Sequence, residues 1–391
     1  MTAPVADNTY DVSQNGVYIT QNGSYFITGS TTTNPITVGN GQDPVPVTIT
    51  LSNVTIDLSG RSGIAFNIQS GSDVVLTLEG INTLISGTDD VGRGIPGIHL
   101  PEGTSLTIQG SGSLTVTGGK LDDWHGGAGI GGGVGGAGIG SGTNSGTGSD
   151  VTIIGGSVTI TGGNGSLVGG AGIGGGACSY GNRGADAGTV IILSPVTVRG
   201  GTGGDWDGVN IGGGQSTSGS AGGNGQGIRP GADGTYEAYG GSFALPDGLV
   251  IPGGATVTVP EGIVLTVPES TTLTNNGTIT GAGGLTVEGD VKGSGSQSLT
   301  GTVTKKDQAG SPAAPTTRDI GSISVTLETQ SGGVAGVEYA CVKGADAAAP
   351  TEEARGRPVS YLAACPRRQS IHFLPGTRGM VFITHPRPAP A

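Results

Sequence analysis

The chain has 391 residues, of which 83 are glycine, only 12% are charged, and the formal net charge is −12 at pH 7. The negative charge argues against nucleic acid and anionic membrane surfaces as partners, because both require clusters of Lys and Arg. No apolar run reaches the roughly 18 residues of a membrane-spanning helix, so we expect no membrane insertion. Long helices are disfavoured, because glycine or proline interrupts nearly every stretch of the chain.

We expect residues 1–19 to form a lead-in or cap before the regular strands. The first residues, MTAPVADNTYDVSQNG, show neither the basic nor the apolar region of a secretory signal peptide. The rest of the chain is nevertheless typical of a secreted surface protein. We therefore expect an extracellular or cell wall-associated protein whose leader is not visible in this chain; a cytoplasmic protein is the alternative.

Short alternating strands dominate residues 20–218. The segment VTITLSNVTIDL, for example, is rich in Val, Ile, Leu and Thr and is followed by glycine-containing turns. Such short strands and tight turns are typical of a parallel β-helix, in which inward-pointing Val, Ile and Leu stack in ladders. The alternative is a β-sandwich, which prefers longer strands and hairpin turns. We expect an all-β protein with a glycine-rich parallel β-helix over 20–218.

Three segments of this zone repeat: 106–133, 151–176 and 190–214. Each contains a strand, a short turn, a second strand, Gly-Gly, a variable tip, and a Gly-Ile-Gly or Asn-Ile-Gly phrase. Their starts lie 45 and 39 residues apart, which predicts about two solenoid turns of roughly 20 residues per repeat. The isoleucine of each phrase is expected to point inward, while glycine permits the tight turns beside it.

The composition changes after the repeats. Residues 219–248 are expected to be a glycine-rich loop, and 249–302 to add further solenoid strands with turns of the PGG and PEG kind. Residues 303–322 have the composition of a linker. Residues 323–342 begin like a small β-sandwich module that does not continue. Residues 343–391 show no strand pattern, and we expect a disordered or frameshifted tail there.

One stretch of the chain resembles a known family. The patterns ITLSNVTIDL, VVLTLEGINTL and LTIQGSGSLTV, carried by Asn53, Gly80, Asn82, Gly110 and Gly112, are similar to those of a bacterial carbohydrate-binding domain on surface proteins of Gram-positive anaerobes. The resemblance covers residues 47–215 well and 249–302 loosely. It implies a pectate-lyase-like, right-handed parallel β-helix that binds polysaccharide. Calcium sites accompany the fold in that family, but no ligand motif matches here.

The candidate binding residues lie in the variable tips of the first and third repeats. Both tips place a tryptophan beside aspartate, and these are the two Trp residues of the chain. An indole offers a flat apolar face to a sugar ring, and a carboxylate accepts hydrogen bonds from its hydroxyls. Structural cover of the solenoid is the alternative role for both tryptophans. The candidates are Asp123, Trp124, His125, Asp205, Trp206 and Asp207.

A few aspartates are candidates for calcium, which prefers several oxygen ligands. They are Asp89, Asp90 and Asp122, although Asp-Asp pairs in turns are ordinarily solvated turn formers. No clustered acid, base and cation set of a glycosidase or lyase is evident, so no catalytic residue is assigned. We expect a non-catalytic polysaccharide-binding or adhesion module for plant cell wall or host glycans. The alternatives are a β-helix glycoside hydrolase or polysaccharide lyase, and a purely structural stalk.

Overall fold

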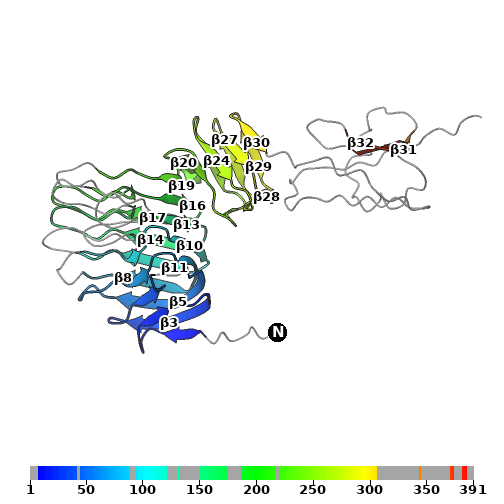
Figure 1. The fold of residues 1–391 in the computed structure, drawn as a ribbon. Helices are drawn as coiled ribbons and strands as arrows, with labels where there is room; N and C mark the ends of the chain where they lie inside the picture. The colour runs from blue at the N-terminus through cyan, green and yellow to red at the C-terminus, as the bar shows by residue number, and fades with distance from the viewer. Residues whose placement is uncertain are drawn as a thin grey trace, which may run out of the picture.

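We describe the fold from a computed structural model, which covers residues 8–305 except 42–44, 89–93, 121–129, 132–148, 175–185 and 216–220, with three short strands beyond them (Figure 1). Within these residues the protein is all-β. Its one helical element there is a short 3-10 turn, Ala232–Gly234, and nearly all strand pairings are parallel. The described part contains no helix with the length and apolar character needed to cross a membrane.

The largest sheet has sixteen strands. Strand β3 pairs along its whole length with β5, and the two halves of β5 then pair with two different strands, β7 and β8. The sheet therefore divides at β5 into two rows. Its strands are β1 (Thr9–Asp11), β3 (Gly23–Thr31), β5 (Val47–Asp57), β7 (Asp73–Glu79), β8 (Ile81–Ile85), β10 (Ser105–Gly110), β11 (Ser113–Thr117), β13 (Asp150–Ile153), β14 (Ser157–Thr161), β16 (Thr189–Ile192), β17 (Val196–Arg199), β19 (Gln226–Pro230), β20 (Tyr236–Tyr239), β23 (Thr256–Thr258), β26 (Thr278–Gly281) and β29 (Ser296–Leu299).

A seven-stranded parallel sheet forms a third row. Its strands have two or three residues each and follow one another in chain order. They are β2 (Val17–Ile19), β4 (Ile36–Val38), β6 (Phe66–Ile68), β9 (Ile98–His99), β12 (Ile130–Gly131), β15 (Ile173–Gly174) and β18 (Ile211–Gly212).

From β7 to β16, each strand pairs in parallel with the strand three places later, so one strand of every successive set of three enters each row. The register sets Leu106 opposite Val151 and Val151 opposite Val190, so the three sequence repeats pair directly with one another. The expectation of two solenoid turns per repeat is therefore wrong. Successive repeats are stacked one set of paired strands apart.

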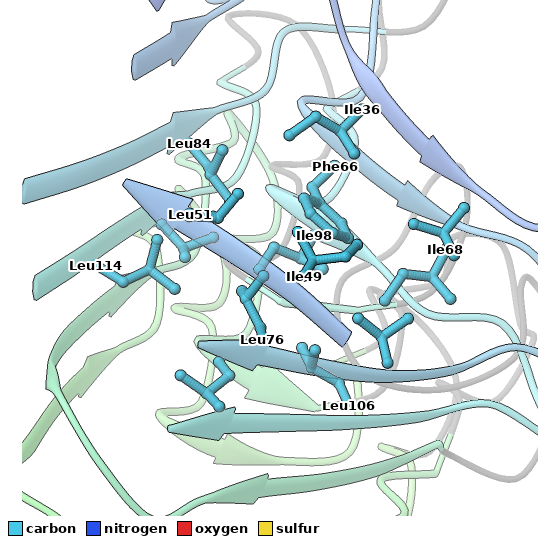
Figure 2. Close-up of a cluster of buried hydrophobic side chains, with 14 of the residues drawn as sticks. Ile36, Ile49, Leu51, Phe66, Ile68, Leu76, Leu84, Ile98, Leu106 and Leu114 are labelled. Carbon is cyan, nitrogen blue, oxygen red and sulfur yellow. The ribbon is translucent and has the colours of Figure 1, made fainter. Parts of the chain in front are cut away.

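Apolar ladders fill the space between the rows, as the alternating pattern predicts. Strands β7, β8, β10 and β11 bury every second residue and turn the others outward. One ladder runs through Ile49, Leu76, Ile108, Ile153 and Ile192, all fully buried. Figure 2 shows the side chains of Ile49 and Leu76 gathered with others from all three rows into one core. Burial of these side chains provides the main stabilisation of the fold.

A second set of strands follows from residue 243 and encloses its own core. It extends the large sheet and adds two small parallel sheets. One consists of β21 (Phe243–Ala244), β24 (Val264–Val267), β27 (Gly284–Val287) and β30 (Val303–Lys305). The other consists of β22 (Val250–Ile251), β25 (Thr272–Asn275) and β28 (Asp290–Lys292).

Strand β16 separates the two cores. Val190 and Ile192 belong to the first core, while Ile191 and Leu193 belong to the second. Both faces of the strand are therefore buried, which explains why the segment VIIL is apolar without alternation.

The chain reverses direction between β19 and β20, whose buried residues Ile228 and Ala238 both belong to the second core. Where the composition predicts a loop over 219–248, the structure contains β19, β20 and β21, and β19 pairs with β20 antiparallel. Strand β19 requires glycine at position 227, because a Cβ there would overlap the carbonyl oxygen of Val190 in the neighbouring strand.

The ends of the chain also carry short strands. The lead-in contains β1 and β2. Beyond residue 305 the structure describes β31 (Lys343–Gly344), β32 (Ser370–Phe373) and β33 (Val381–Thr384), which form a small sheet within the segment expected to be a tail. The predicted linker beyond residue 305 and the predicted sandwich-like module over 323–342 lie outside the described residues.

Candidate functional site

The variable tips of the second and third repeats lie against each other through their backbones. The N–H of Gly204 donates to the carbonyl oxygen of Ser166 at 3.0 Å, and the N–H of Trp206 donates to that of Leu167 at 3.1 Å. Trp206 also forms a parallel bridge with Val168. The backbone of Trp206 is thus fixed by its neighbour and does not belong to an isolated loop.

The arms that carry these tips require glycine. The N–H of Gly201 donates to the carbonyl oxygen of Gly170 at 2.7 Å, and the N–H of Gly208 donates to that of Gly201 at 2.8 Å. A Cβ at Gly201 would overlap the carbonyl oxygen of Gly163, and one at Gly208 would overlap that of Gly170. The glycine-rich phrases therefore allow backbones to pack together with no side chain between them.

Trp206 is 54% exposed and lies between two exposed carboxylates, those of Asp205 and Asp207. The carboxylate oxygen Oδ1 of Asp207 accepts a hydrogen bond from the N–H of Gly203 at 2.9 Å, which fixes the turn that presents the indole. An exposed indole beside carboxylates is a combination suited to a sugar ring and its hydroxyls.

The equivalent tip of the first repeat cannot be compared with this one. Six of the nine predicted site residues lie outside the described residues: Asp89, Asp90, Asp122, Asp123, Trp124 and His125. The role of Trp124 as a second sugar contact therefore stays a prediction.

The second repeat places polar groups, and no aromatic ring, at its tip. There, Oδ1 of Asn164 accepts a hydrogen bond from the N–H of Thr202 in the third repeat at 2.9 Å. The side chain of Asn164 therefore contributes to holding the two tips together.

Within the ranges described above, no group of three or more His, Cys, Asp or Glu side chains is close enough to share a metal ion. The three calcium candidates lie outside these ranges, so calcium binding through them stays a prediction.

His99 has a defined partner in the seven-stranded sheet. Its Nδ1 lies 2.8 Å from Oδ1 of Asn67, the residue paired with it on strand β6. Burial lowers the pKa of His99 to about 4, although a backbone hydrogen bond to Ile68 acts in the opposite direction. The imidazole is consequently neutral at pH 7.

Sequence reasoning did not single out Tyr18. This residue is the middle one of the three in β2, and its side chain is 67% exposed while Val17 and Ile19 on either side are buried. The alternation of VYI places the ring outside the core. The same alternation does not give the exposed fraction of the ring, which depends on how other segments pack around it. Tyr18 was missed for this reason.

One comparison with known proteins gives a match. Residues 13–168 match the sequence model of a family described as carbohydrate-binding domain-containing protein. This match supports carbohydrate binding by this part of the chain, and Trp206 lies outside it. No curated protein and no solved structure matches the chain.

Proposed function

We propose that the protein is a non-catalytic polysaccharide-binding module. The observation that carries the proposal is the match of residues 13–168 to a carbohydrate-binding family. The exposed Trp206 between two carboxylates supports it, because aromatic rings and hydrogen-bonding groups together recognise sugars. The tips of the first and third repeats, with Asp123, Trp124 and His125 in one and the Trp206 group in the other, are the proposed contact points.

We further propose that the three rows of strands wind as a right-handed parallel β-helix. The successive strands enter the three rows in turn and pair in parallel with the strands three places later. Apolar side chains of all three rows belong to one core cluster. An experimental structure would test both the closure of each turn and its hand.

We also propose that the protein acts outside the cell, where plant cell wall or host glycans would be its partners and adhesion its role. The low charge content and the glycine-rich repeats support this location. Antibody labelling of intact cells and of the culture medium tests it: exclusive recovery from the cytoplasmic fraction would contradict it.

The central experiment is a pull-down of the purified chain with insoluble polysaccharides, with an assay for released reducing sugar and unsaturated product. Binding without turnover is expected. Turnover would favour the glycosidase or lyase alternative, and neither binding nor turnover would favour a structural stalk. Repeating the assay with calcium and with a chelator tests whether calcium contributes through Asp89, Asp90 or Asp122.

The contribution of the third-repeat tip is tested by Trp206→Ala. Loss of one stacking aromatic ring is expected to weaken binding roughly tenfold. The matched control is Val303→Ala, which removes another exposed apolar side chain (42% exposed), from β30. Equal binding by the two variants would remove Trp206 from the site.

A further inference from the structure

A single file of side chains runs along the outer face of the seven-stranded sheet. The register pairs Tyr18 of β2 with Thr37 of β4, Thr37 with Asn67 of β6, and Asn67 with His99 of β9. We call these four residues the outer strip. The residues on either side of each member are buried, so each strand turns one side chain outward here.

The aromatic end of the outer strip is the most exposed. Tyr18 is 67% exposed, while Thr37, Asn67 and His99 are half-buried. A Cβ at Gly16 would lie 3.2 Å from Cε2 of the Tyr18 ring, so the backbone of Gly16 lies beside the ring. The absence of a side chain at Gly16 leaves room for the ring in this position.

The other end of the outer strip has oriented polar groups. Oδ1 of Asn67 can only accept a hydrogen bond, so Nδ1 of His99 donates to it across 2.8 Å. This contact fixes the orientation of the Asn67 amide and leaves its two Nδ2 hydrogens for other acceptors. The strip therefore combines an amide, a hydroxyl and an imidazole.

A neighbouring outward column shows what is typical of this fold. On β8, β11, β14 and β17 the paired outward residues are all threonines: Thr83, Thr115, Thr159 and Thr197. Threonine suits any outward strand position. The sequence of Tyr, Thr, Asn and His in the outer strip departs from this default, and asparagine is disfavoured in strands.

The family match coincides with the outer strip. All four of its residues lie within 13–168, the segment that matches a carbohydrate-binding family, whereas Trp206 lies beyond it. Of the described side chains in that segment, the well-exposed large apolar ones are Tyr18 and Ile81. In the described part of the matched segment, Tyr18 is therefore the well-exposed aromatic ring on which a sugar can stack.

We propose that the outer strip binds one chain of a neutral polysaccharide that runs across the strands, with a sugar ring stacked on Tyr18. Neighbouring strands lie about 4.8 Å apart, so the four side chains extend over roughly 14 Å. The separation of neighbouring strands is close to the length that one pyranose unit adds to an extended chain. The strip carries no charge at pH 7 and the chain has a net charge of −12, so an anionic polymer is disfavoured. This inference rests on the proposed polysaccharide binding.

The test uses the full chain and affinity electrophoresis in gels with hydroxyethyl cellulose, a neutral polymer, or polygalacturonate, an anionic one. Tyr18→Ala is expected to weaken binding to the neutral polymer about tenfold, and Thr37→Val to weaken it about threefold. Tyr18→Phe should retain most binding, because the ring remains. Ile81→Ala, which removes a 72% exposed apolar side chain within the matched segment, is the control and should bind like the wild type.

The outcomes distinguish the two proposals. A wild-type chain that binds neither these polymers nor insoluble polysaccharides would overturn the proposed function and the outer strip with it. Wild-type binding that Tyr18→Ala and Thr37→Val leave unchanged would overturn the strip alone. Binding of polygalacturonate in preference to hydroxyethyl cellulose would overturn the neutral ligand. Circular dichroism of every variant shows whether lost binding reflects lost folding.

Discussion

The side-chain oxygen Oδ1 of Asn82 accepts a hydrogen bond of 2.9 Å from the backbone N–H of Val54, on the neighbouring strand β5. The Nδ2 group of the same side chain donates to the carbonyl oxygens of Glu79 at 3.0 Å and Ser113 at 3.1 Å. Asn82 is 1% exposed. One buried amide therefore connects β5, β8 and β11 and satisfies three backbone groups.

Replacement of Asn82 by alanine should be strongly destabilising. It leaves a backbone N–H and two carbonyl groups without their partner, and we expect a loss of about 3 kcal/mol in the free energy of unfolding. Urea unfolding followed by circular dichroism measures it. Asn276→Ala, at an exposed position, is the control and should change stability by less than about 0.5 kcal/mol. Similar values for the two variants would contradict the bridging role of Asn82.

Acid should destabilise the protein through His99. Burial lowers the folded-state pKa of His99 to about 4, against 6.5 for a solvent-exposed histidine in the unfolded chain. Between these values the unfolded chain binds the proton more readily, so stability falls as the pH decreases from about 6.5 to about 4. Over this window the wild type should lose roughly 2–3 kcal/mol relative to His99→Gln. Parallel pH profiles of the two proteins would contradict this prediction.

The glycine-rich arms should not tolerate even a methyl group. At Gly201 a Cβ would overlap the carbonyl oxygen of Gly163, whereas at Gly60 it would meet no atom within 4 Å. We expect Gly201→Ala to lower the free energy of unfolding by about 2 kcal/mol or more, because two backbones must separate. Gly60→Ala should be close to neutral. Thermal unfolding compares them, and equal melting temperatures would show that the arms can adjust.

Two equivalent turns of the second strand set, 260–263 and 268–271, begin with Pro-Glu and differ in their third and fourth residues. The N–H groups of Ile263 and Thr271 donate to the carbonyls of Pro260 and Pro268, both at 3.2 Å. The third turn residue has a positive φ in each case, 82° at Gly262 and 64° at Ser270.

Glycine adopts this conformation without strain, while serine does not. Ser270→Gly should therefore stabilise the protein by about 0.5 kcal/mol, and Gly262→Ala should destabilise it by about 1 kcal/mol. Chemical unfolding measures both changes. A stability loss in Ser270→Gly would mean that the serine side chain contributes more than its strained backbone costs.

The strands and the inward ladders followed from the sequence, because alternation in segments such as 47–57 fixes which residues face the core. The register between repeats did not follow. Repeat spacings of 45 and 39 residues are compatible with one or two solenoid turns, and only the pairing of Leu106 with Val151 decides. The strands over 226–244 were also missed, because glycine is a turn signal in a sequence whether or not a neighbouring backbone occupies the space of its side chain.

The candidate sites show the same limit. The tip of Trp206 could be found from composition, because tryptophan beside aspartate is conspicuous in a chain with 83 glycines. The outer strip could not, because its members lie between 19 and 32 residues apart and each has an ordinary place in an alternating segment. Their alignment arises only from the register of strands whose connections differ in length.

The double burial of β16 makes assembly of the molecule directional. The side of β16 that carries Ile191, together with Leu193 directly after the strand, becomes a surface for the second core once Val190 and Ile192 have been fixed by the first. The second core is complete only when β16 is in place, because Ile191 of this strand forms part of that core. The first set of strands therefore has to position β16 before the later set can pack. During synthesis, which proceeds from the N-terminus, this surface emerges before the strands that must cover it.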